Sequence, residues 1–176
     1  MSGSPLLEGL PPIGSPDARL VILGNMPSVL SLASGQYYGN PRNAFWRIIG
    51  ELYGCAPDAP YAQRTAILER HDIAVWDVLK HCRRIGSLDS AIEPDTMVAN
   101  DFGSFFAAHA SVERVYFNGA AAERNFTRLV DFDVPSTLRL PSTSPAQTMR
   151  YADKLATWRA ALSDVAGPAA PAAGAR

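Results

Sequence analysis

The feature that most constrains the fold is an unbroken apolar run, Leu-Val-Ile-Leu at residues 20–23, which ends at Gly24. A short apolar run without alternation is typical of a strand that is buried on both faces of a parallel sheet. The next residues, Asn-Met-Pro-Ser at 25–28, predict a turn at the carboxyl end of that strand. Because open α/β sheets bind ligands beyond the carboxyl ends of their strands, we expect this turn to line a site.

Three further segments predict strands of the same sheet, at residues 73–78, 112–118 and 137–141. Helices are predicted between or after them at residues 44–53, 61–71, 102–109, 120–130 and 152–165. Strands that alternate with helices are typical of a parallel sheet with helices on both faces. Right-handed crossovers would bring the loops after the strands to one edge of the sheet, where they begin at Gly24, Asp77, Asn118 and Pro141.

The chain of 176 residues is expected to form one domain. Residues 1–17 are rich in Pro and Gly and predict an N-terminal arm that lies on the surface. Residues 18–165 form the predicted α/β domain, and the Ala/Pro-rich residues 166–176 are expected to be a disordered tail. Residues 78–86 predict a strand end that leads into a loop, and residues 87–95 an irregular or short helical segment.

Composition excludes several classes of protein. A net charge of −1 provides no global basic surface, so a nucleic-acid binder would need a local basic patch. Two cysteines, Cys55 and Cys82, cannot supply a four-cysteine iron–sulfur cluster, and the histidines show no metal-ligand spacing. We therefore expect no metal and no cofactor. The sequence has no run long enough for a membrane helix and no signal-peptide pattern, which predicts a cytoplasmic protein.

Aromatic and amide side chains are concentrated after the first predicted turn. They are two adjacent tyrosines, Tyr37 and Tyr38, with Gln36, Asn40 and Asn43. A pocket that stacks on a flat polar ring and hydrogen-bonds its edge needs this combination, whereas few structural loops do. Because adjacent side chains in an extended segment point in opposite directions, we expect one tyrosine in the core and the other in the pocket.

Two long motifs carry a specific resemblance. Residues 24–46 are G-N-M-P-S-x-x-S-L-x-x-x-Q-Y-Y-x-N-P-R-N-x-F-W, and residues 140–146 are L-P-S-T-S-P-A. The pattern resembles the uracil-DNA glycosylase superfamily, most closely its hypoxanthine-DNA (deoxyinosine) glycosylase branch. It is also similar to the mismatch-specific uracil/thymine branch. The resemblance spans residues 20 to 162 and implies a three-layer α/β/α sandwich around a four-stranded parallel sheet.

The resemblance implies that Asn43 positions the attacking water, because it matches the asparagine of the P-R-N-x-F-W motif. Cleavage of an N-glycosidic bond has an oxocarbenium-like transition state, so the water needs placement more than strong deprotonation. An uncharged amide suits that task. Asn43 is also well placed to cap the helix that follows, and the two roles can coexist only if the cap leaves part of the side chain free.

Asn25 is the competing candidate for the catalytic role. The mismatch-specific branch has its catalytic asparagine in the first motif, at the position that is Met26 here. Asn25 lies one residue earlier, and the favoured interpretation is a turn residue that hydrogen-bonds its own backbone. Gly24 and Met26 are expected to contribute to the wall of the base pocket.

Two residues are expected to contact the base itself. Tyr38 matches the aromatic residue that stacks on the extruded base, a contact worth about 1–3 kcal/mol that tolerates different bases. Asp77 follows the second strand and aligns with an asparagine of other branches. A carboxylate there could accept the N1–H of hypoxanthine, which adenine lacks. The alternative is an aspartate that caps a helix or forms a turn.

Contacts with the DNA backbone are expected from both motifs. The resemblance places Ser142, Thr143 and Ser144 in a segment that pinches the backbone beside the flipped nucleotide, although a surface turn is the alternative. The remaining candidates for contact with DNA are Ser28, Arg42 and Arg150.

The sequence also departs from the family pattern. Residues 140–150 contain no histidine, although several branches have one there that stabilises the base anion. Asn40 and Gln147 stand where relatives often have histidine and asparagine. These departures leave the substrate range open.

The sequence therefore predicts a monofunctional DNA glycosylase of base-excision repair that removes a deaminated base, with hypoxanthine as the leading substrate. Lys80 and Lys154 are the only lysines and neither lies in a motif, so no Schiff base is expected. The alternatives are excision of uracil or of G:U and G:T mismatches on the same fold, or a catalytically inactive relative that binds nucleic acid. The expected partner is DNA with a deaminated base, bound by a monomer.

Overall fold

A four-stranded parallel sheet forms the centre of the computed structural model, which describes residues 3–134 and 136–163. Its strands lie in the order β3-β2-β6-β7. Their bounds are β2 Leu20–Gly24, β3 Ile73–Asp77, β6 Arg114–Asn118 and β7 Thr137–Leu140. All three pairings are parallel, so the four carboxyl ends lie at one edge of the sheet. The predicted four-stranded parallel sheet is confirmed.

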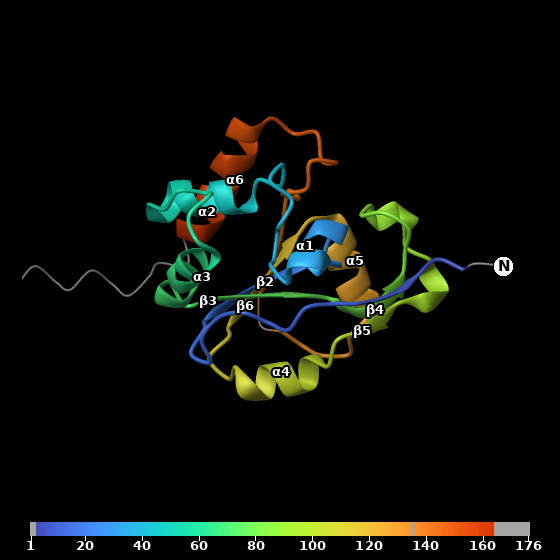
Figure 1. Cartoon of the computed structure of the whole chain (residues 1–176). Helices are drawn as coiled ribbons and strands as arrows, with labels where there is room; N and C mark the ends of the chain where they lie inside the picture. Colours follow the sequence, from blue (N-terminus) through green and yellow to red (C-terminus); the bar gives the residue numbers. More distant parts are fainter. Residues whose placement is uncertain (1–2, 135, 164–176) are drawn as a thin grey trace, which may run out of the picture.

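Within the described residues, six α-helices cover this sheet or extend its loops (Figure 1). They are α1 Val29–Ser34, α2 Phe45–Tyr53, α3 Tyr61–Arg70, α4 Phe102–Ala108, α5 Ala120–Leu129 and α6 Tyr151–Ser163. Figure 1 shows α4 on one side of the sheet and α2 and α6 on the other. The predicted three-layer α/β/α sandwich is confirmed.

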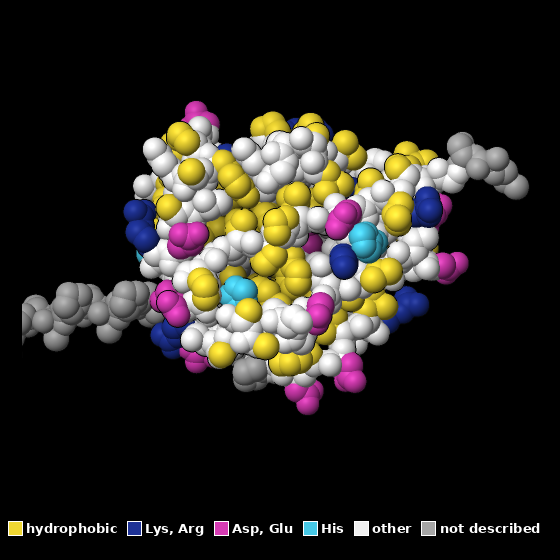
Figure 2. Space-filling model, turned by 60° about the horizontal axis from the view of Figure 1, so that its bottom comes forward, with side chains coloured by type: hydrophobic (Ala, Val, Ile, Leu, Met, Phe, Trp, Pro, Cys, Tyr) yellow, Lys and Arg dark blue, Asp and Glu magenta, His cyan; other side chains and the backbone are white. Residues whose placement is uncertain are grey.

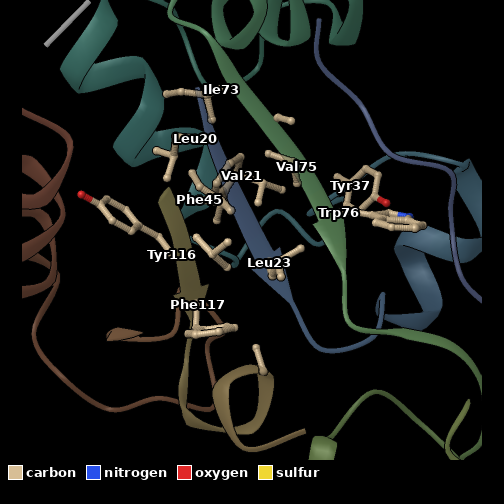
Figure 3. Packing of buried hydrophobic residues seen from close by; sticks show 14 of the residues in the cluster. Leu20, Val21, Leu23, Tyr37, Phe45, Ile73, Val75, Trp76, Tyr116 and Phe117 are labelled. Atoms are coloured by element: carbon tan, nitrogen blue, oxygen red, sulfur yellow. The ribbon is translucent and has the colours of Figure 1, made fainter. Parts of the chain in front are cut away.

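Two neighbouring residues of β6 contact helices on opposite faces of the sheet. The Tyr116 side chain points toward α6 (Figure 3), where its hydroxyl donates to the Ala161 carbonyl at 3.3 Å. The next ring, Phe117, packs on Phe126 of α5 with a centroid separation of 5.3 Å. Because side chains alternate along a strand, a central strand covered on both faces needs apolar residues at every position. This is why the apolar run at residues 20–23 is fully buried as β2.

A second, smaller sheet was not predicted. β1 Leu6–Glu8, β4 Leu79–Arg83 and β5 Val98–Ala99 pair antiparallel in the order β1-β4-β5. The expectation of a loop after residue 78 is therefore wrong, because β4 continues the chain as a strand that pairs with the N-terminal arm. The expected short helical segment is present as two 3₁₀ helices, η1 Asp89–Ala91 and η2 Pro94–Thr96.

The face of the molecule that carries α4 is shown in Figure 2, and hydrophobic side chains occupy much of its middle. Lys and Arg side chains on this face are scattered among Asp and Glu. This face is therefore not the local basic patch that a nucleic-acid binder of this net charge requires. Among the described residues, no helix is both long and apolar enough to cross a membrane. The predicted tail at residues 166–176 lies outside the described residues.

Replacing Trp158 by alanine is expected to lower the free energy of unfolding by about 3–5 kcal/mol, as for other large-to-small core substitutions. Trp158 is 0% exposed, meets Phe45 edge-on at 6.1 Å and donates from Nε1 to the Pro141 carbonyl at 2.9 Å. Urea unfolding measures the loss. The control Leu138→Ala, at a residue 41% exposed, should change stability by less than about 0.5 kcal/mol. Equal losses in the two variants would contradict this account of the core.

Candidate active site

A cavity of about 90 Å³ lies at the carboxyl edge of the parallel sheet. The ends of β2, β3 and β6 reach it with Gly24, Asp77 and Asn118, and the segment after β7 reaches it with Ser142. All the predicted site residues except Arg42 and Arg150 line this cavity. The two motifs, which lie far apart in the sequence, therefore meet in one pocket.

Gly24 lets two neighbouring groups approach the end of β2 closely. A Cβ added at Gly24 would lie 2.4 Å from Oδ1 of Asp77 and 3.2 Å from the Tyr38 hydroxyl. Backbone hydrogen bonds then join the turn to β3 and β4, from Val78 N–H to the Gly24 carbonyl at 2.8 Å and from Leu79 N–H to the Asn25 carbonyl at 3.0 Å. The floor of the cavity is thus rigid backbone with no room for a side chain at residue 24.

Asn25 is buried, and its amide is occupied on both sides. Its Nδ2 donates to Oδ1 of Asp89 at 3.0 Å, and its Oδ1 accepts from Nδ2 of Asn125 at 2.8 Å. The favoured interpretation, a turn residue that hydrogen-bonds its own backbone, is wrong, because the partners of the Asn25 amide are distant residues. Neither Asp89 nor Asn125 was predicted to belong to the site, because their roles depend on tertiary contacts.

Asn43 lines the cavity and lies one residue before Ala44, the N-cap of α2. The alternative role of Asn43 as the helix cap is therefore wrong, since α2 has no side-chain cap bond. Its Oδ1 accepts the Phe45 N–H at 3.0 Å, and its own N–H donates to the Asn40 carbonyl at 2.9 Å. Within the described residues, Nδ2 of Asn43 has no hydrogen-bond partner. A carbonyl oxygen has two lone pairs, so the bond from Phe45 leaves one acceptor position and both N–H groups of the Asn43 amide available for a ligand or a water.

The two adjacent tyrosines have different surroundings. Tyr37 is in the core, where its hydroxyl donates to the backbone carbonyls of Leu10 and Pro11 at 3.1 and 2.9 Å. Trp76 lies beside it (Figure 3) and donates from Nε1 to the same Leu10 carbonyl at 3.1 Å. Tyr37 therefore fastens the N-terminal arm to the domain, although part of it also lines the cavity.

Tyr38 has a positive φ of 54°, which turns its side chain toward the cavity. Its ring stacks on Phe45 with a centroid separation of 4.1 Å, and its hydroxyl accepts from Nδ2 of Asn118 at 3.1 Å. Burial, and after it the charge of Asp77, raises the pKa of Tyr38 well above its usual value, so the hydroxyl keeps its proton. Since the Asn118 amide donates to this oxygen, the Tyr38 hydrogen is available to a ligand.

Asn118 was not predicted as a site residue, yet it joins the two motifs. Its Oδ1 accepts the Thr143 N–H at 2.9 Å, and its Nδ2 donates to Oγ1 of Thr143 at 2.9 Å as well as to Tyr38. The Thr143 carbonyl in turn accepts the Ala44 N–H at 2.9 Å. A signal was present in the sequence, because Asn118 ends a strand just as Asp77 does.

The serines of the two motifs line the cavity and are half-buried. Ser28 caps α1, accepting the Ser31 N–H at 3.1 Å. Ser142 accepts the Ser144 N–H at 3.1 Å, and Ser144 accepts the Ala146 N–H at 3.2 Å. These local bonds hold the turns in shape. The hydroxyls of Ser142 and Ser144 still have a hydrogen to donate, whereas Ser28 donates its own to Oγ of Ser31 at 3.1 Å. Thr143 is fully buried, so its hydroxyl serves Asn118 rather than the surface.

The predicted arginines lie outside the cavity. Arg42 lines a neighbouring groove together with Arg47 and Lys154, and that groove shares Asn43 and Ser144 with the cavity. Arg42 and Arg47 are the exposed cations of this groove, whereas Lys154 is 4% exposed and donates from Nζ to the Gln147 carbonyl at 3.3 Å. Arg150 is highly exposed and pairs with Asp153 at 3.0 Å.

Asp77 is the most perturbed acid of the site. It is 3% exposed, and its Oδ2 is buried without a hydrogen-bond partner among the described residues. Burial, and after it the charge of Asp89, raises the pKa of Asp77 to about 7, while Arg84 opposes the rise. Buried polar groups in proteins are normally paired, so an unpaired oxygen on a residue that lines a cavity indicates a position that a ligand completes.

The described residues contain no group of three or more His, Cys, Asp or Glu side chains that could hold a metal ion. Within those residues, the chemistry available in the cavity comes from amides, hydroxyls, the carboxyl groups of Asp77 and Asp89, and backbone N–H groups.

Comparisons with known proteins agree with this arrangement. A model of the uracil DNA glycosylase superfamily matches residues 11–166. A Methanosarcina acetivorans protein named hypoxanthine DNA glycosylase is 33% identical over 154 residues, which are 87% of this chain and 96% of that protein. A Methanosarcina barkeri protein of the same name is 34% identical over 113 residues, or 64% of this chain and 70% of the relative.

A solved structure has the same fold. It is the solution NMR structure of a Methanosarcina acetivorans protein assigned as a candidate uracil DNA glycosylase. It superimposes with a TM-score of 0.77 and 31% sequence identity, covering 91% of this chain and 98% of the other.

Proposed function

The chain belongs to the uracil DNA glycosylase superfamily, and from that premise we propose that it removes hypoxanthine from DNA. Its activity is that of a DNA glycosylase, which hydrolyses the bond between a base and deoxyribose. The choice of substrate site rests on the cavity at the carboxyl edge of the sheet, where both motifs meet. The two relatives named hypoxanthine DNA glycosylase support hypoxanthine over other deaminated bases.

In the proposed mechanism, the target nucleotide leaves the stack and its base enters the cavity. Asn43 positions the water that attacks the anomeric carbon, and the free acceptor position of its Oδ1 supports this role. Asn25 is not assigned to the water, because Asp89 and Asn125 already occupy its amide. It supports the turn at residues 25–28 instead.

Tyr38, Asp77, Gly24 and Met26 are proposed to hold the base. Gly24 leaves space for the ring, Met26 forms part of the wall, and Tyr38 offers both a ring face and a hydroxyl hydrogen. Asp77 faces the hydrogen-bonding edge of the base. Because no histidine lies in residues 140–150, the negative charge on the departing base is stabilised by fixed donors such as the Tyr38 hydroxyl.

The DNA strand is proposed to cross the edge of the cavity and the neighbouring basic groove. The hydroxyls of Ser142 and Ser144 then contact phosphates, and that of Ser28 does so by exchanging its bond to Oγ of Ser31 for a phosphate oxygen. Thr143 acts indirectly by holding Asn118. Arg42 lies in the groove, and Arg150 is exposed beyond it. In this proposal the enzyme is a cytoplasmic monomer of base-excision repair, with residues 18–165 as its catalytic domain.

The substrate preference is expected to appear in single-turnover cleavage of duplexes that each carry deoxyinosine, deoxyuridine or deoxyxanthosine. Deoxyinosine should give an alkali-labile abasic site at least about tenfold faster than the others, a difference of about 1.4 kcal/mol in the barrier. The strand should stay intact until alkali is added, because the proposed mechanism uses no lysine.

Other results would select the alternatives. Faster release from deoxyuridine, alone or in mismatches, would assign the chain to uracil excision. Salt-dependent binding without product from any duplex would indicate an inactive relative that only binds nucleic acid.

A further inference from the structure

The strongest unexplained feature of the site is the Asp77 carboxyl group. It ends β3 opposite Gly24 of β2, lines the cavity, and is buried. One oxygen, Oδ1, packs against Gly24, and the other, Oδ2, has no partner within the described part of the chain. A carboxylate in such a place lacks the hydrogen bonds that normally stabilise a buried charge.

The charged and titratable groups around Asp77 come from several elements. Asp89 of η1 adds a second negative charge, and the hydroxyls of Tyr37 and Tyr38 keep their protons. Arg84, which follows β4, is the one cation that acts on the pKa of Asp77. Its Nε donates to the Gly86 carbonyl at 2.7 Å and its Nη2 to the Pro27 carbonyl at 2.6 Å. No ion pair joins Arg84 to Asp77 among the described residues.

Burial and the neighbouring acid therefore outweigh the effect of the arginine. The pKa of Asp77 rises to about 7, so a large fraction of the free enzyme carries this group as a neutral acid near neutral pH. A neutral carboxyl group presents one O–H donor beside one carbonyl acceptor, as the amide of an asparagine does, whereas a carboxylate presents only acceptors.

Resting on the proposed function, we propose that Asp77 binds the flipped base as a neutral acid, donating its O–H to the base carbonyl and accepting the adjacent ring N–H. Hypoxanthine carries N1–H beside O6, so the two planar groups form a pair of complementary hydrogen bonds. A carboxylate could accept the N1–H, but its second oxygen would face O6, and two acceptors repel. Uracil has the same N–H beside a carbonyl, so the pairing would also hold for that base.

The protonation state sets the direction of the pH profile. We would measure base release from a deoxyinosine duplex under single-turnover conditions with sub-saturating enzyme, from about pH 5.5 to about pH 8.5, where the rate reports the free enzyme. The wild-type rate should fall about tenfold for each pH unit above the Asp77 pKa of about 7.

Three variants sharpen this test. Asp77→Asn should keep its rate within about tenfold of the wild-type maximum and show no fall across the range, because its amide offers the same donor and acceptor. Asp77→Ala should be at least about a hundredfold slower at every pH, since it offers neither. Asp89→Asn should shift the decrease in rate to lower pH, because it removes a negative charge that raises the pKa of Asp77. The asparagine keeps an acceptor for the Asn25 amide.

Unfolding without DNA gives an independent readout. The pKa of Asp77 is higher in the folded chain than in the unfolded chain, so the folded state holds an extra proton between the two pKa values and loses stability as pH rises through that window. The urea midpoint of wild type should fall relative to that of Asp77→Asn from about pH 4 to about pH 7 and then level off.

The outcomes are distinguishable. A wild-type rate that is flat, or that rises with pH and is lost in Asp77→Asn, would overturn the neutral-acid proposal while leaving the glycosylase function intact. The neutral-acid proposal would also be overturned if the urea midpoints of wild type and Asp77→Asn changed with pH in the same way. Asp77 would then be ionised in the folded chain. Absence of base release at every pH would instead reject the proposed function, and the inference with it.

Discussion

Asn43→Ala is expected to slow single-turnover release of hypoxanthine by about 10²–10⁴-fold, the range by which positioned catalytic groups accelerate proton-transfer steps. The variant removes the side-chain amide of Asn43, so the attacking water would lose the acceptor that is proposed to position it. Affinity for the damaged duplex should change little, because Asn43 is proposed to place the water rather than to hold the base or the phosphates.

The loss of activity must be separated from a loss of stability at the start of α2. Oδ1 of Asn43 accepts the Phe45 N–H at 3.0 Å, and removal of this hydrogen bond should cost about 0.5–1.5 kcal/mol of stability. Asp101→Ala is the matched control, because Asp101 caps α4 by accepting the Ser104 N–H at 3.0 Å and does not line the cavity. It should lose similar stability and keep its activity. Activity that survives Asn43→Ala would return the catalytic role to Asn25.

Gly24→Ala is expected to reduce base release by at least about a hundredfold, comparable to the loss of a preorganised group in an active site. The new methyl group would lie 2.4 Å from Oδ1 of Asp77 and 3.2 Å from the Tyr38 hydroxyl. Both groups are proposed to hold the base, and neither can move far because each is buried or hydrogen-bonded. The strain should also cost about 1–3 kcal/mol of folding stability.

Gly103→Ala provides the control for adding a methyl group. Gly103 lies in α4, where an added Cβ would meet only Oδ1 of Asp101 at an ordinary 3.4 Å. This variant should retain wild-type activity and stability. If Gly24→Ala released base within about threefold of the wild-type rate, a difference well under 1 kcal/mol, the close packing at the end of β2 would have no role in the reaction.

The parallel sheet could be predicted because its strands carry a local signal. Leu20, Val21, Ile22 and Leu23 are all apolar, and only a strand covered on both faces requires that pattern. The segments of the site could be predicted for a related reason, since the loops after parallel strands share one edge and the two motifs lie in such loops.

The small sheet could not be predicted in the same way. The pairing of Leu6 with Arg83 joins residues that are far apart in the sequence, and three-residue β1 lies among prolines and glycines that argue against a strand. The six residues of α1 are likewise too few to show a helical period. In both places tertiary contacts, not local preference, decide the structure.

Some residues of the site could likewise be predicted from the sequence, and others could not. Asn43 and Asp77 could be singled out from a motif and from a strand end, but the sequence contains no sign that Asp89 and Asn125 would occupy the Asn25 amide. Arg84 gave no signal either, because a buried arginine bonded to the Pro27 and Gly86 carbonyls looks like any other arginine in the sequence. These contacts arise only when η1, α5 and the segment after β4 meet around the turn.

The most direct test of the account is to identify the product released from a deoxyinosine duplex by the wild-type protein, using mass spectrometry of the small-molecule fraction together with gel analysis of the strand. The account predicts free hypoxanthine in an amount equal to the abasic sites formed, with the strand cut only after alkali. Bound DNA that releases no base, or a strand cut without release of hypoxanthine, would contradict it.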